Sequence, residues 1–509
     1  MNRFCLTLGV LCCITTMLLS SENPLAGTEK PATAFEDPAP PEVMTIKSSS
    51  IDEAKPYDRV TFHTAPKPLS ATAVTHDWTH FMGPDHKPIS SETELLHEWP
   101  EKGPALVWEL KKGMSYSSPS IQGDRLIFTH RVEDNVLVEC LHPETGEAYW
   151  QYSYPSEYQD RYGYGNGPRA SPVIHGDRVL LYGAEGQLIC LHLPSGQLIW
   201  KREVSREFKA PQDFFGSVGT PLVVGNKVII NVGAPDGPCV AAFDVKTGRL
   251  LWGAGDKWGP SYASPIPATV HGKQRVFVFA GGDSNPPTGG LLSLDPENGH
   301  IDFEFPWRSK SYESVNASCP VIVDDTVFVT ATYKAGSALL KINEDMTHEQ
   351  LWTTKDVGLH WNTAVAHEGF LYAFDGRNEP DASLVCVDLK TGEVVWREVP
   401  LWEETIPVNK QEEKIEVSTM RGTLLMVDGK FLCLGELGHL LWLDLTPKGY
   451  KMEQRAWLFA GRETWAMPVL SRGLLYVSQN TKDLLTNVGP RLLCYDLRGG
   501  TSKDDASSK

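Results

Sequence analysis

Residues 242–252, AFDVKTGRLLW, and residues 386–396, CVDLKTGEVVW, are two copies of the unit from which this chain is built. Each copy runs from an apolar strand through Asp and a Lys-Thr-Gly turn into a second apolar strand that ends at Trp. The same register returns in segments that end at Trp150, Trp200, Phe303, Trp352 and, more loosely, Trp457. Because self-similarity at a regular spacing indicates a repeat architecture, this pattern decides the fold.

An eighth copy is divided between the two ends of the chain. Residues 494–500, CYDLRGG, stop at the turn, whereas residues 105–110, ALVWEL, supply a strand with Trp108 and no preceding turn. We expect this strand to be the outermost one of the blade whose inner three strands come from residues 467–497. Such pairing of the N- and C-terminal segments closes a ring without an open sheet edge at the closure.

Each copy has a second landmark, a small residue that is followed by Pro in most copies, as at Ser118-Pro119. An apolar strand follows, then a tight turn such as Gly123-Asp124, then an alternating strand, and this order is typical of a hairpin. The unit is therefore four antiparallel strands, repeated eight times over residues 106–497. Eight such sheets cover one another only in a radial arrangement, so we predict an all-β, eight-bladed β-propeller over residues 76–500.

The two ends of the chain differ from the repeats in composition. Residues 1–21 start with Arg3 and continue with an uncharged apolar run, which predicts a secretory signal peptide; an uncleaved N-terminal membrane anchor is the alternative, because Leu19 is poor at a cleavage site. Residues 22–75 are rich in Pro without an apolar period and predict a disordered linker, and residues 501–509 predict a disordered tail. We expect an exported protein of the periplasm or cell envelope.

The overall composition excludes several classes of partner. The 509 residues include 41% hydrophobic residues and 15 Trp, which is ample material for a core, and the formal net charge is −17. An acidic chain is a poor partner for nucleic acid or an anionic membrane surface, because both require basic patches. We therefore expect no nucleic-acid binding, and we expect a monomer.

The repeat resembles the tryptophan-docking motif of the pyrroloquinoline quinone (PQQ) propeller family. Residues 241–252, AAFDVKTGRLLW, and 385–396, VCVDLKTGEVVW, match its consensus closely, and residues 77–84, DWTHFMGP, are similar to the start of secreted, uncharacterised members. The resemblance covers most of the repeat region and implies the propeller fold. It implies two classes of function, quinoprotein dehydrogenases and non-enzymatic propellers similar to the outer-membrane β-barrel assembly lipoprotein.

For the dehydrogenase class, the resemblance implies PQQ on the propeller axis, between a Trp and often a disulfide of adjacent cysteines, with Ca²⁺ held by Glu, Asn and Asp. The only adjacent cysteines, Cys12 and Cys13, lie in the predicted signal peptide, and the sequence has no Cys-x-x-Cys-His motif for a c-type haem. Four cysteines share one repeat position and are predicted to be small buried fillers: Cys140, Cys190, Cys386 and Cys494. We therefore assign no cofactor from the sequence and keep PQQ with calcium as the alternative.

The best candidate for a binding site lies where the innermost strands begin. Seven of the eight copies carry Gly, Ala or Ser one residue before the landmark, because eight strands crowd toward one axis there. The adjoining positions form the mouth, where aromatic and basic side chains suit a planar or anionic ligand through stacking and bidentate hydrogen bonds. The predicted ligand-binding residues are Tyr116, Arg169, Tyr262, Asn316, Trp361, Asn362, Arg421 and Trp465. The alternative is that these positions line a water-filled channel.

Three further features of the mouth bear on function. His360 is the candidate for acid–base chemistry, with a structural loop histidine as the alternative. Glu313, Asn316, Asn362 and Glu463 carry oxygen ligands of the type that Ca²⁺ prefers, but their spacing has no calcium-loop signature, so we predict no metal site. Tyr158, Tyr162 and Tyr164 predict a partner-binding loop, because Tyr offers a large contact area at low entropic cost.

These observations favour a binding scaffold without catalysis, whose partner is an envelope or extracellular protein or a small planar or anionic ligand. The alternative is a PQQ-dependent dehydrogenase of alcohols or sugars. In that case Trp361 or Trp465 would stack on the cofactor, and Arg169 or Arg421 would meet its carboxylates.

Overall fold

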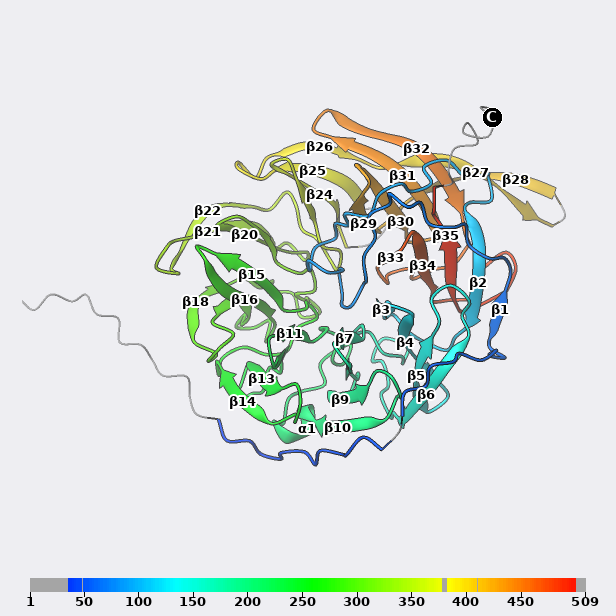
Figure 1. Ribbon diagram of the computed structural model, residues 1–509. Coiled ribbons are helices and arrows are strands. Elements are labelled where there is room, and N and C mark those ends of the chain that lie inside the picture. The colour runs from blue at the N-terminus through cyan, green and yellow to red at the C-terminus, as the bar shows by residue number, and fades with distance from the viewer. Residues whose placement is uncertain (1–34, 48, 378–381, 410, 500–509) are drawn as a thin grey trace, which may run out of the picture. The chain divides into compact units, whose positions relative to one another are not determined.

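The computed structural model describes residues 35–47, 49–377, 382–409 and 411–499. Within these residues eight blade sheets surround a central axis (Figure 1), and the single short helix is α1 (Val204–Glu207). The predicted all-β, eight-bladed β-propeller is therefore confirmed. No helix in the described part of the chain has the length and apolar character needed to cross a membrane. The predicted signal peptide 1–21, linker residues 22–34 and tail 501–509 lie outside the described residues.

We number the blades in chain order. Blade 1 contains β3 (Ser120–Gln122), β4 (Arg125–Val132), β5 (Asn135–Leu141) and β6 (Ala148–Pro155). Blade 2 contains β7 (Val173–His175), β8 (Arg178–Tyr182), β9 (Gln187–His192) and β10 (Leu198–Glu203). Blade 3 contains β11 (Leu222–Val224), β12 (Lys227–Asn231), β13 (Val240–Asp244) and β14 (Leu250–Ala254). Blade 4 contains β15 (Ile266–Val270), β16 (Lys273–Ala280), β17 (Gly290–Leu294) and β18 (Ile301–Pro306).

The remaining blades follow the same order from the axis outward. Blade 5 contains β19 (Val321–Val323), β20 (Thr326–Ala331), β21 (Gly336–Ile342) and β22 (His348–Thr354). Blade 6 contains β23 (Val365–His367), β24 (Phe370–Asp375), β25 (Ser383–Asp388) and β26 (Val394–Glu398). A separate hairpin of β27 (Leu401–Val408) and β28 (Gln411–Ser418) leads to blade 7, with β29 (Gly422–Val427), β30 (Lys430–Gly435), β31 (His439–Thr446) and β32 (Gly449–Trp457).

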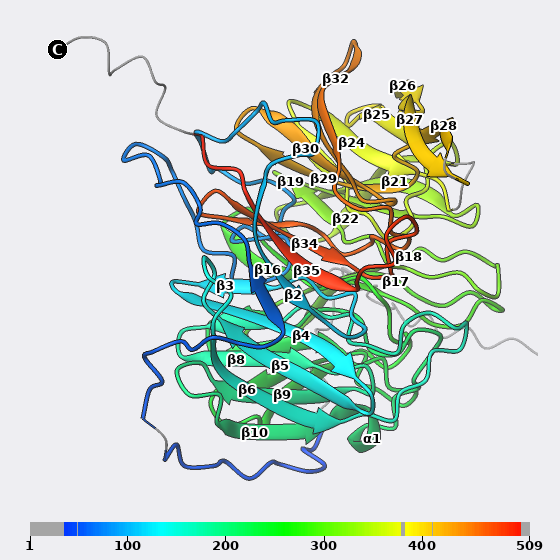
Figure 2. The same cartoon turned by 90° about the vertical axis from the view of Figure 1, so that its right-hand side faces the viewer.

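Blade 8 closes the ring by joining both ends of the chain. Its inner strands are β33 (Val469–Ser471), β34 (Leu474–Gln479) and β35 (Arg491–Asp496), and its outer strands are β2 (Ala105–Lys111) and β1 (Val60–Phe62). Strands β2 and β35 are antiparallel neighbours with Trp108 opposite Cys494, which confirms the predicted closure (Figure 2). Strand β1 pairs with the outer edge of β2 and gives blade 8 a fifth strand, which the sequence did not predict.

The repeat residues hold neighbouring blades together through the turn between the third and fourth strands. In blade 3 the Asp244 carboxylate accepts the Thr247 backbone N–H at 2.8 Å, and Gly248 takes a positive φ of 68°. The Trp200 indole of blade 2 lies against this turn and donates from Nε1 to the Val245 carbonyl at 3.0 Å. The motif therefore shapes a turn in one blade and fills the gap to the preceding blade.

Equivalent indole contacts recur around most of the ring. The other tryptophans that donate from Nε1 to the corresponding turn of the next blade are Trp108, Trp150, Trp252, Trp352 and Trp396. Blade 4 instead places Phe303 against the His348 ring of blade 5, with ring centroids 4.5 Å apart. Trp457 of blade 7 donates within its own blade to Leu437, so it does not dock on blade 8.

A segment that we call the strap, residues 35–47 and 49–64, follows the outside of blades 3, 2, 1 and 8 (Figure 1). The Asp37 carboxylate meets the fully buried Arg202 guanidinium of β10, with Oδ1 2.6 Å from Nη2. Farther along, Lys55 and Ala148 exchange two backbone hydrogen bonds of 2.8 and 2.9 Å. The prediction of a disordered linker over residues 22–75 is therefore wrong for its described part. A single segment added to existing sheet edges needs no apolar period of its own, and such edges tolerate proline.

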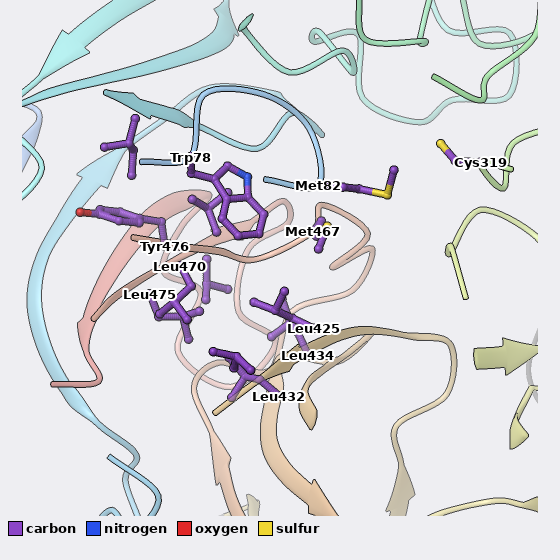
Figure 3. Close-up of a cluster of buried hydrophobic side chains, with 14 of the residues drawn as sticks. Trp78, Met82, Cys319, Leu425, Leu432, Leu434, Met467, Leu470, Leu475 and Tyr476 are labelled. Atoms are coloured by element: carbon purple, nitrogen blue, oxygen red, sulfur yellow. The ribbon is translucent and has the colours of Figure 1, made fainter. Parts of the chain in front are cut away.

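A second segment that we call the plug, residues 77–95, crosses one end of the propeller axis (Figures 1 and 3). Trp78 exchanges backbone hydrogen bonds of 2.7 and 2.9 Å with Ile121 of blade 1. The Met426 backbone of blade 7 donates to the Pro88 carbonyl of the plug and accepts the Ser90 N–H. In Figure 3 the Trp78 ring lies among residues of blade 8, and Met82 extends away from it toward the side where Cys319 lies. Both plug side chains are 1% exposed, so the axial channel is filled at this end.

We expect Gly248→Ala to destabilise the protein more than Gly272→Ala does. Both glycines have positive φ, 68° and 74°, so both substitutions carry the cost of a left-handed alanine, about 1–2 kcal/mol. Only at Gly248 would the new Cβ lie 2.7 Å from the Trp200 ring, whereas nothing lies within 4 Å at Gly272. Urea unfolding of the two variants measures the difference, and equal losses of stability would contradict the docking contact.

Candidate functional site

A pocket opens on the propeller axis where the inner strands begin. Its volume is about 280 Å³. Phe81 and Met82 of the plug line one end, and the loops that lead into the inner strands line the rest. Seven predicted ligand-binding residues line it: Tyr116, Arg169, Tyr262, Trp361, Asn362, Arg421 and Trp465. His360 and Tyr164 are also in the lining, so the fold brings most of the predicted mouth together.

Hydroxyl side chains join the blades around this pocket. The Ser118 backbone N–H donates to Oγ of Ser171 at 3.2 Å, and the Ser171 N–H donates to Oγ1 of Thr220 at 3.1 Å. Thr220 continues the series to Ser264 at 3.0 Å, and the same contact recurs between blades 5 and 6. These contacts were not predicted from the sequence, because the prediction of the mouth used only the small residue before the landmark. The recurring Ser or Thr at the landmark was the available signal.

Asn316 is the predicted ligand-binding residue that does not line the pocket. Its buried amide donates from Nδ2 to the carbonyls of Ala280 and Trp307 at 2.9 and 3.1 Å. Asn362 does line the pocket, but its amide donates to and accepts from the backbone of Phe374, at 2.9 and 3.3 Å. Both amides therefore hold neighbouring backbone, although the buried Oδ1 of Asn316 has no hydrogen-bond partner among the described residues.

Arg169 is paired with a carboxylate that the sequence analysis did not identify. Its Nη2 lies 2.7 Å from Oδ2 of Asp160, whose side chain is fully buried. The other Asp160 oxygen accepts the backbone N–H groups of Tyr162 and Tyr164 at 2.9 and 3.0 Å, so the carboxylate organises the tyrosine loop. The guanidinium carbon lies 5.2 Å from the Tyr116 ring centroid. The charge of Arg169 is thus compensated within the protein.

Arg421 is compensated in the same way by Glu436. Its Nε lies 2.9 Å from Oε2 of Glu436, and its Nη2 contacts the other carboxylate oxygen. The Trp465 indole donates to the same carboxylate at 2.6 Å, and the Arg421 guanidinium carbon lies 5.4 Å from the Trp465 ring centroid. A ligand anion would therefore compete with a buried carboxylate for each of these two arginines, which lowers what the arginines add to its affinity.

His360 lies in the lining, but it is poorly suited to acid–base work at neutral pH. Burial, assisted by the charges of Arg421 and Arg377, lowers the pKa of His360 to about 3. Its Nε2 is 3.2 Å from the Tyr333 hydroxyl, and its Nδ1 has no hydrogen-bond partner among the described residues. A general base works best with a pKa near the operating pH, so a neutral His360 is a hydrogen-bonding group here.

The residues at the mouth match only in part the PQQ and Ca²⁺ site that the family resemblance implies. Within the described ranges, no three His, Cys, Asp or Glu side chains converge as metal ligands. Glu463 accepts the Tyr116 hydroxyl, and Glu313 lies 3.3 Å from Arg377. The Trp361 and Trp465 rings fit the stacking role, but the carboxylates of such a cofactor would meet arginines that are already paired. The lining thus fits a planar ring better than this anionic cofactor with its metal.

The described cysteines are all free and buried. The four that share one repeat position, Cys140, Cys190, Cys386 and Cys494, are 0% exposed and lie in β5, β9, β25 and β35, which confirms their prediction as buried fillers. Cys319 is the described cysteine that reaches the pocket lining. The adjacent Cys12 and Cys13 of the predicted signal peptide lie outside the described residues.

The three tyrosines of the predicted partner-binding loop separate into two kinds. Tyr158 is 2% exposed and donates its hydroxyl to Asp160 at 3.1 Å, so it stabilises the loop from within and cannot face a partner. Tyr162 and Tyr164 are 43% and 38% exposed. The part of this loop that can contact another molecule is therefore its outer tip.

We expect His360→Gln to lose less stability than the wild type between pH 6.5 and pH 4. Because the pKa of buried His360 is lowered to about 3, protons bind the unfolded chain first as the pH falls below about 6.5. This histidine then costs the wild type about 1 kcal/mol of folding free energy per pH unit in that window. Urea unfolding at several pH values measures the free energy of unfolding of the two proteins. If this free energy changed with pH in parallel for both, the buried, neutral state of His360 would be contradicted.

Comparison with known proteins supports the family resemblance. A family model described as outer membrane protein assembly factor BamB matches residues 133–398, which is just over half of the chain. The quinohemoprotein alcohol dehydrogenase ADH IIB of Pseudomonas putida is 29% identical over 133 residues, covering 25% of this chain and 18% of that protein. The outer membrane protein assembly factor BamB of Burkholderia pseudomallei (strain K96243) is 28% identical over 197 residues, covering 37% of this chain and 43% of that protein. The chain thus matches less than half the length of either relative.

Two solved structures share the fold. BamB from Moraxella catarrhalis has a TM-score of 0.52 at 14% identity and covers 78% of this chain and 99% of that one. The quinohemoprotein alcohol dehydrogenase from Comamonas testosteroni has a TM-score of 0.54 at 13% identity, and the match covers 84% of this chain and 81% of that one. At this identity the likeness concerns the fold alone. Together with the family model and the tryptophan-docking repeats, it shows that the chain belongs to the family of PQQ-repeat β-propellers.

Proposed function

We propose that this protein is an exported, monomeric binding scaffold of the periplasm or cell envelope, with a ligand site in the axial pocket. The observation that carries the proposal is the pocket itself, which the plug closes at one end and which aromatic side chains line at the other. Tyr116 and Trp465 stack there with ring centroids 5.4 Å apart and an angle of 18° between the rings. Concave, mostly apolar sites with a few placed polar groups are typical of small-ligand binding.

The polar groups of the lining support binding more than turnover. Arg169 and Arg421 are each paired with a buried carboxylate, so neither they nor their partners are poised to exchange a proton. His360, the candidate for acid–base chemistry, has a pKa too low for that task at neutral pH. Paired charges of this kind orient the aromatic rings that they contact, and rigid orientation of a site favours affinity.

The proposed protein partner is an envelope or extracellular protein that contacts the outer tip of the tyrosine loop. Tyr162 and Tyr164 are exposed, and Asp160 holds the backbone of both, so contact with a partner costs little conformational entropy. The family match to an outer membrane protein assembly factor supports this kind of partner.

A pull-down from an envelope extract tests the protein-binding part. We expect the wild type to retain an outer-membrane or extracellular protein that the Tyr162→Ala/Tyr164→Ala double variant loses. Phe62→Ala is the matched control, since Phe62 is an exposed aromatic residue on the strap. Equal recovery by the wild type and the double variant would remove the loop from the proposed interface.

A second candidate function is a PQQ-dependent dehydrogenase of alcohols or sugars. It is favoured by Trp361 and Trp465, which lie on the lining as the stacking role requires, and by the partial match to a quinohemoprotein alcohol dehydrogenase. The cofactor when bound would supply the oxidation chemistry. Trp361 or Trp465 would stack on it, and Arg169 or Arg421 would reach its carboxylates only by sharing their present partners.

Reconstitution distinguishes the two functions. After PQQ and Ca²⁺ are added to the full chain, we expect no dye-linked oxidation of ethanol or glucose, because the paired arginines and the low pKa of His360 do not suit proton abstraction. Absorbance spectra recorded in parallel report whether PQQ is retained. Micromolar PQQ binding with turnover that Trp465→Ala abolishes would establish the dehydrogenase instead.

A further inference from the structure

An unbroken series of aromatic side chains leads from the pocket outward over the mouth. We call it the aromatic rail, and it consists of Trp465, Tyr164, Phe215, Tyr162, Phe214 and Tyr312. Successive ring centroids along it are 5.3, 6.0, 5.7, 5.8 and 5.5 Å apart. The loops that carry these rings belong to different blades, so only the closed propeller brings them together.

The two ends of the rail differ in exposure. Trp465, Tyr164 and Phe215 line the pocket, whereas Tyr312 at the far end is 68% exposed. Tyr162, in the middle, is 43% exposed. Phe214 is 7% exposed, so it is a buried ring that contacts both Tyr162 and Tyr312. The exposed rings outward from the pocket are therefore Tyr164, Tyr162 and Tyr312.

The pocket itself has compensated charge. Each arginine in its lining has a carboxylate partner: Arg169 with Asp160, Arg421 with Glu436 and Arg377 with Glu313. A ligand with a net charge would gain little here, because it would have to displace a partner of opposite sign. A paired guanidinium and carboxylate still offer additional N–H groups and lone pairs, which suit hydroxyl groups.

We propose that the pocket and the aromatic rail form one binding site for a neutral oligosaccharide chain. The inference rests on the proposed function of the axial pocket and names the class of its ligand. A sugar ring presents C–H groups on its faces for aromatic stacking and hydroxyl groups at its edge for the paired charges. The exposed tyrosines of the rail, Tyr164, Tyr162 and Tyr312, offer such contacts outside the pocket.

The rail shares Tyr162 and Tyr164 with the proposed protein-binding tip, so an oligosaccharide and a protein partner would compete there, and the shape of pocket and rail together favours the chain. A protein surface could cover Tyr162 and Tyr312, but it would leave the pocket of about 280 Å³ unfilled. A single small planar molecule would fill the pocket and leave the rail unused. In this proposal the end of an oligosaccharide enters the pocket, and the rest of the chain continues over Tyr164 and Tyr162.

Calorimetric titration of the full chain tests this site. The probes are disaccharides and hexasaccharides of β-1,4-linked glucose, α-1,4-linked glucose and β-1,4-linked mannose, with polygalacturonate as the polyanion and PQQ as a planar anionic probe. We expect at least one neutral series to bind, with the hexasaccharide at least about tenfold tighter than its disaccharide, because only the longer chain reaches Tyr312 at the far end of the rail. Binding should persist from about 0.1 to 1 M NaCl, because no ion pair with the ligand is screened.

Two variants separate the ends of the site. Tyr312→Ala should remove the advantage of the hexasaccharide and leave disaccharide binding unchanged, since Tyr312 is an exposed residue at the far end of the rail. Trp465→Ala should weaken both lengths about tenfold. Phe62→Ala, an exposed aromatic residue away from the mouth, should change neither.

The possible failures are distinguishable. If PQQ binds and Trp465→Ala weakens it, while no neutral saccharide binds, the oligosaccharide inference is overturned and the axial ligand site stands. If neither PQQ nor any saccharide binds, both the inference and the proposed axial site are overturned. Preference for polygalacturonate, or a hexasaccharide affinity that Tyr312→Ala leaves intact, would also overturn the inference.

Discussion

The docking of an outer-strand indole on the turn of the next blade is the contact on which the rest of this structure depends. The ring fills the space above a glycine, and its Nε1 bonds a backbone carbonyl, as Trp200 does with Val245. Because the contact recurs around the ring, it sets the rotation between neighbouring blades. Where Trp457 does not dock, Trp442 bonds Leu96 instead, and this contact joins blade 7 to the segment that leads into β2. The inner strands then begin at a common level, and the mouth residues meet.

The pocket at the mouth owes its depth to a segment outside the repeats. A propeller axis is open at both ends unless something enters it, and the plug enters from the side away from the mouth, since it bonds Ile121 and Met426 near the ends of the inner strands β3 and β29. Trp78 anchors the plug to blade 1, and Met82 reaches the pocket lining. The strap acts on the outside of the same blades, where Asp37 neutralises the buried Arg202. The strap thus covers outer strands, whereas the plug fills one end of the axis and leaves the other end as the open face among the described residues.

Charge compensation decides what that face can bind. The mouth contains the arginines and aromatic rings that suggested an anionic ligand, but Asp160 and Glu436 occupy the arginines. Under the proposal, stacking on the aromatic side chains then contributes more to ligand binding than ion pairing does. The paired charges serve as hydrogen-bonding groups for neutral polar ligands. Under the proposed function, this balance suits binding rather than redox chemistry at the axis, and the pocket adjoins the exposed rings of the tyrosine loop.

The sequence by itself determined the number of blades, the closure at Trp108 and the positions that face the axis, because each follows from a local pattern repeated at regular spacing. Only the tertiary structure decided the plug, the strap and the partners of the mouth residues. Tyr116 meets Glu463, 347 positions away, and Arg202 meets Asp37 across 165 positions. Such pairs arise where the closed ring brings distant loops together. No periodicity records them, since each partner belongs to a loop or a terminal segment rather than to the repeat.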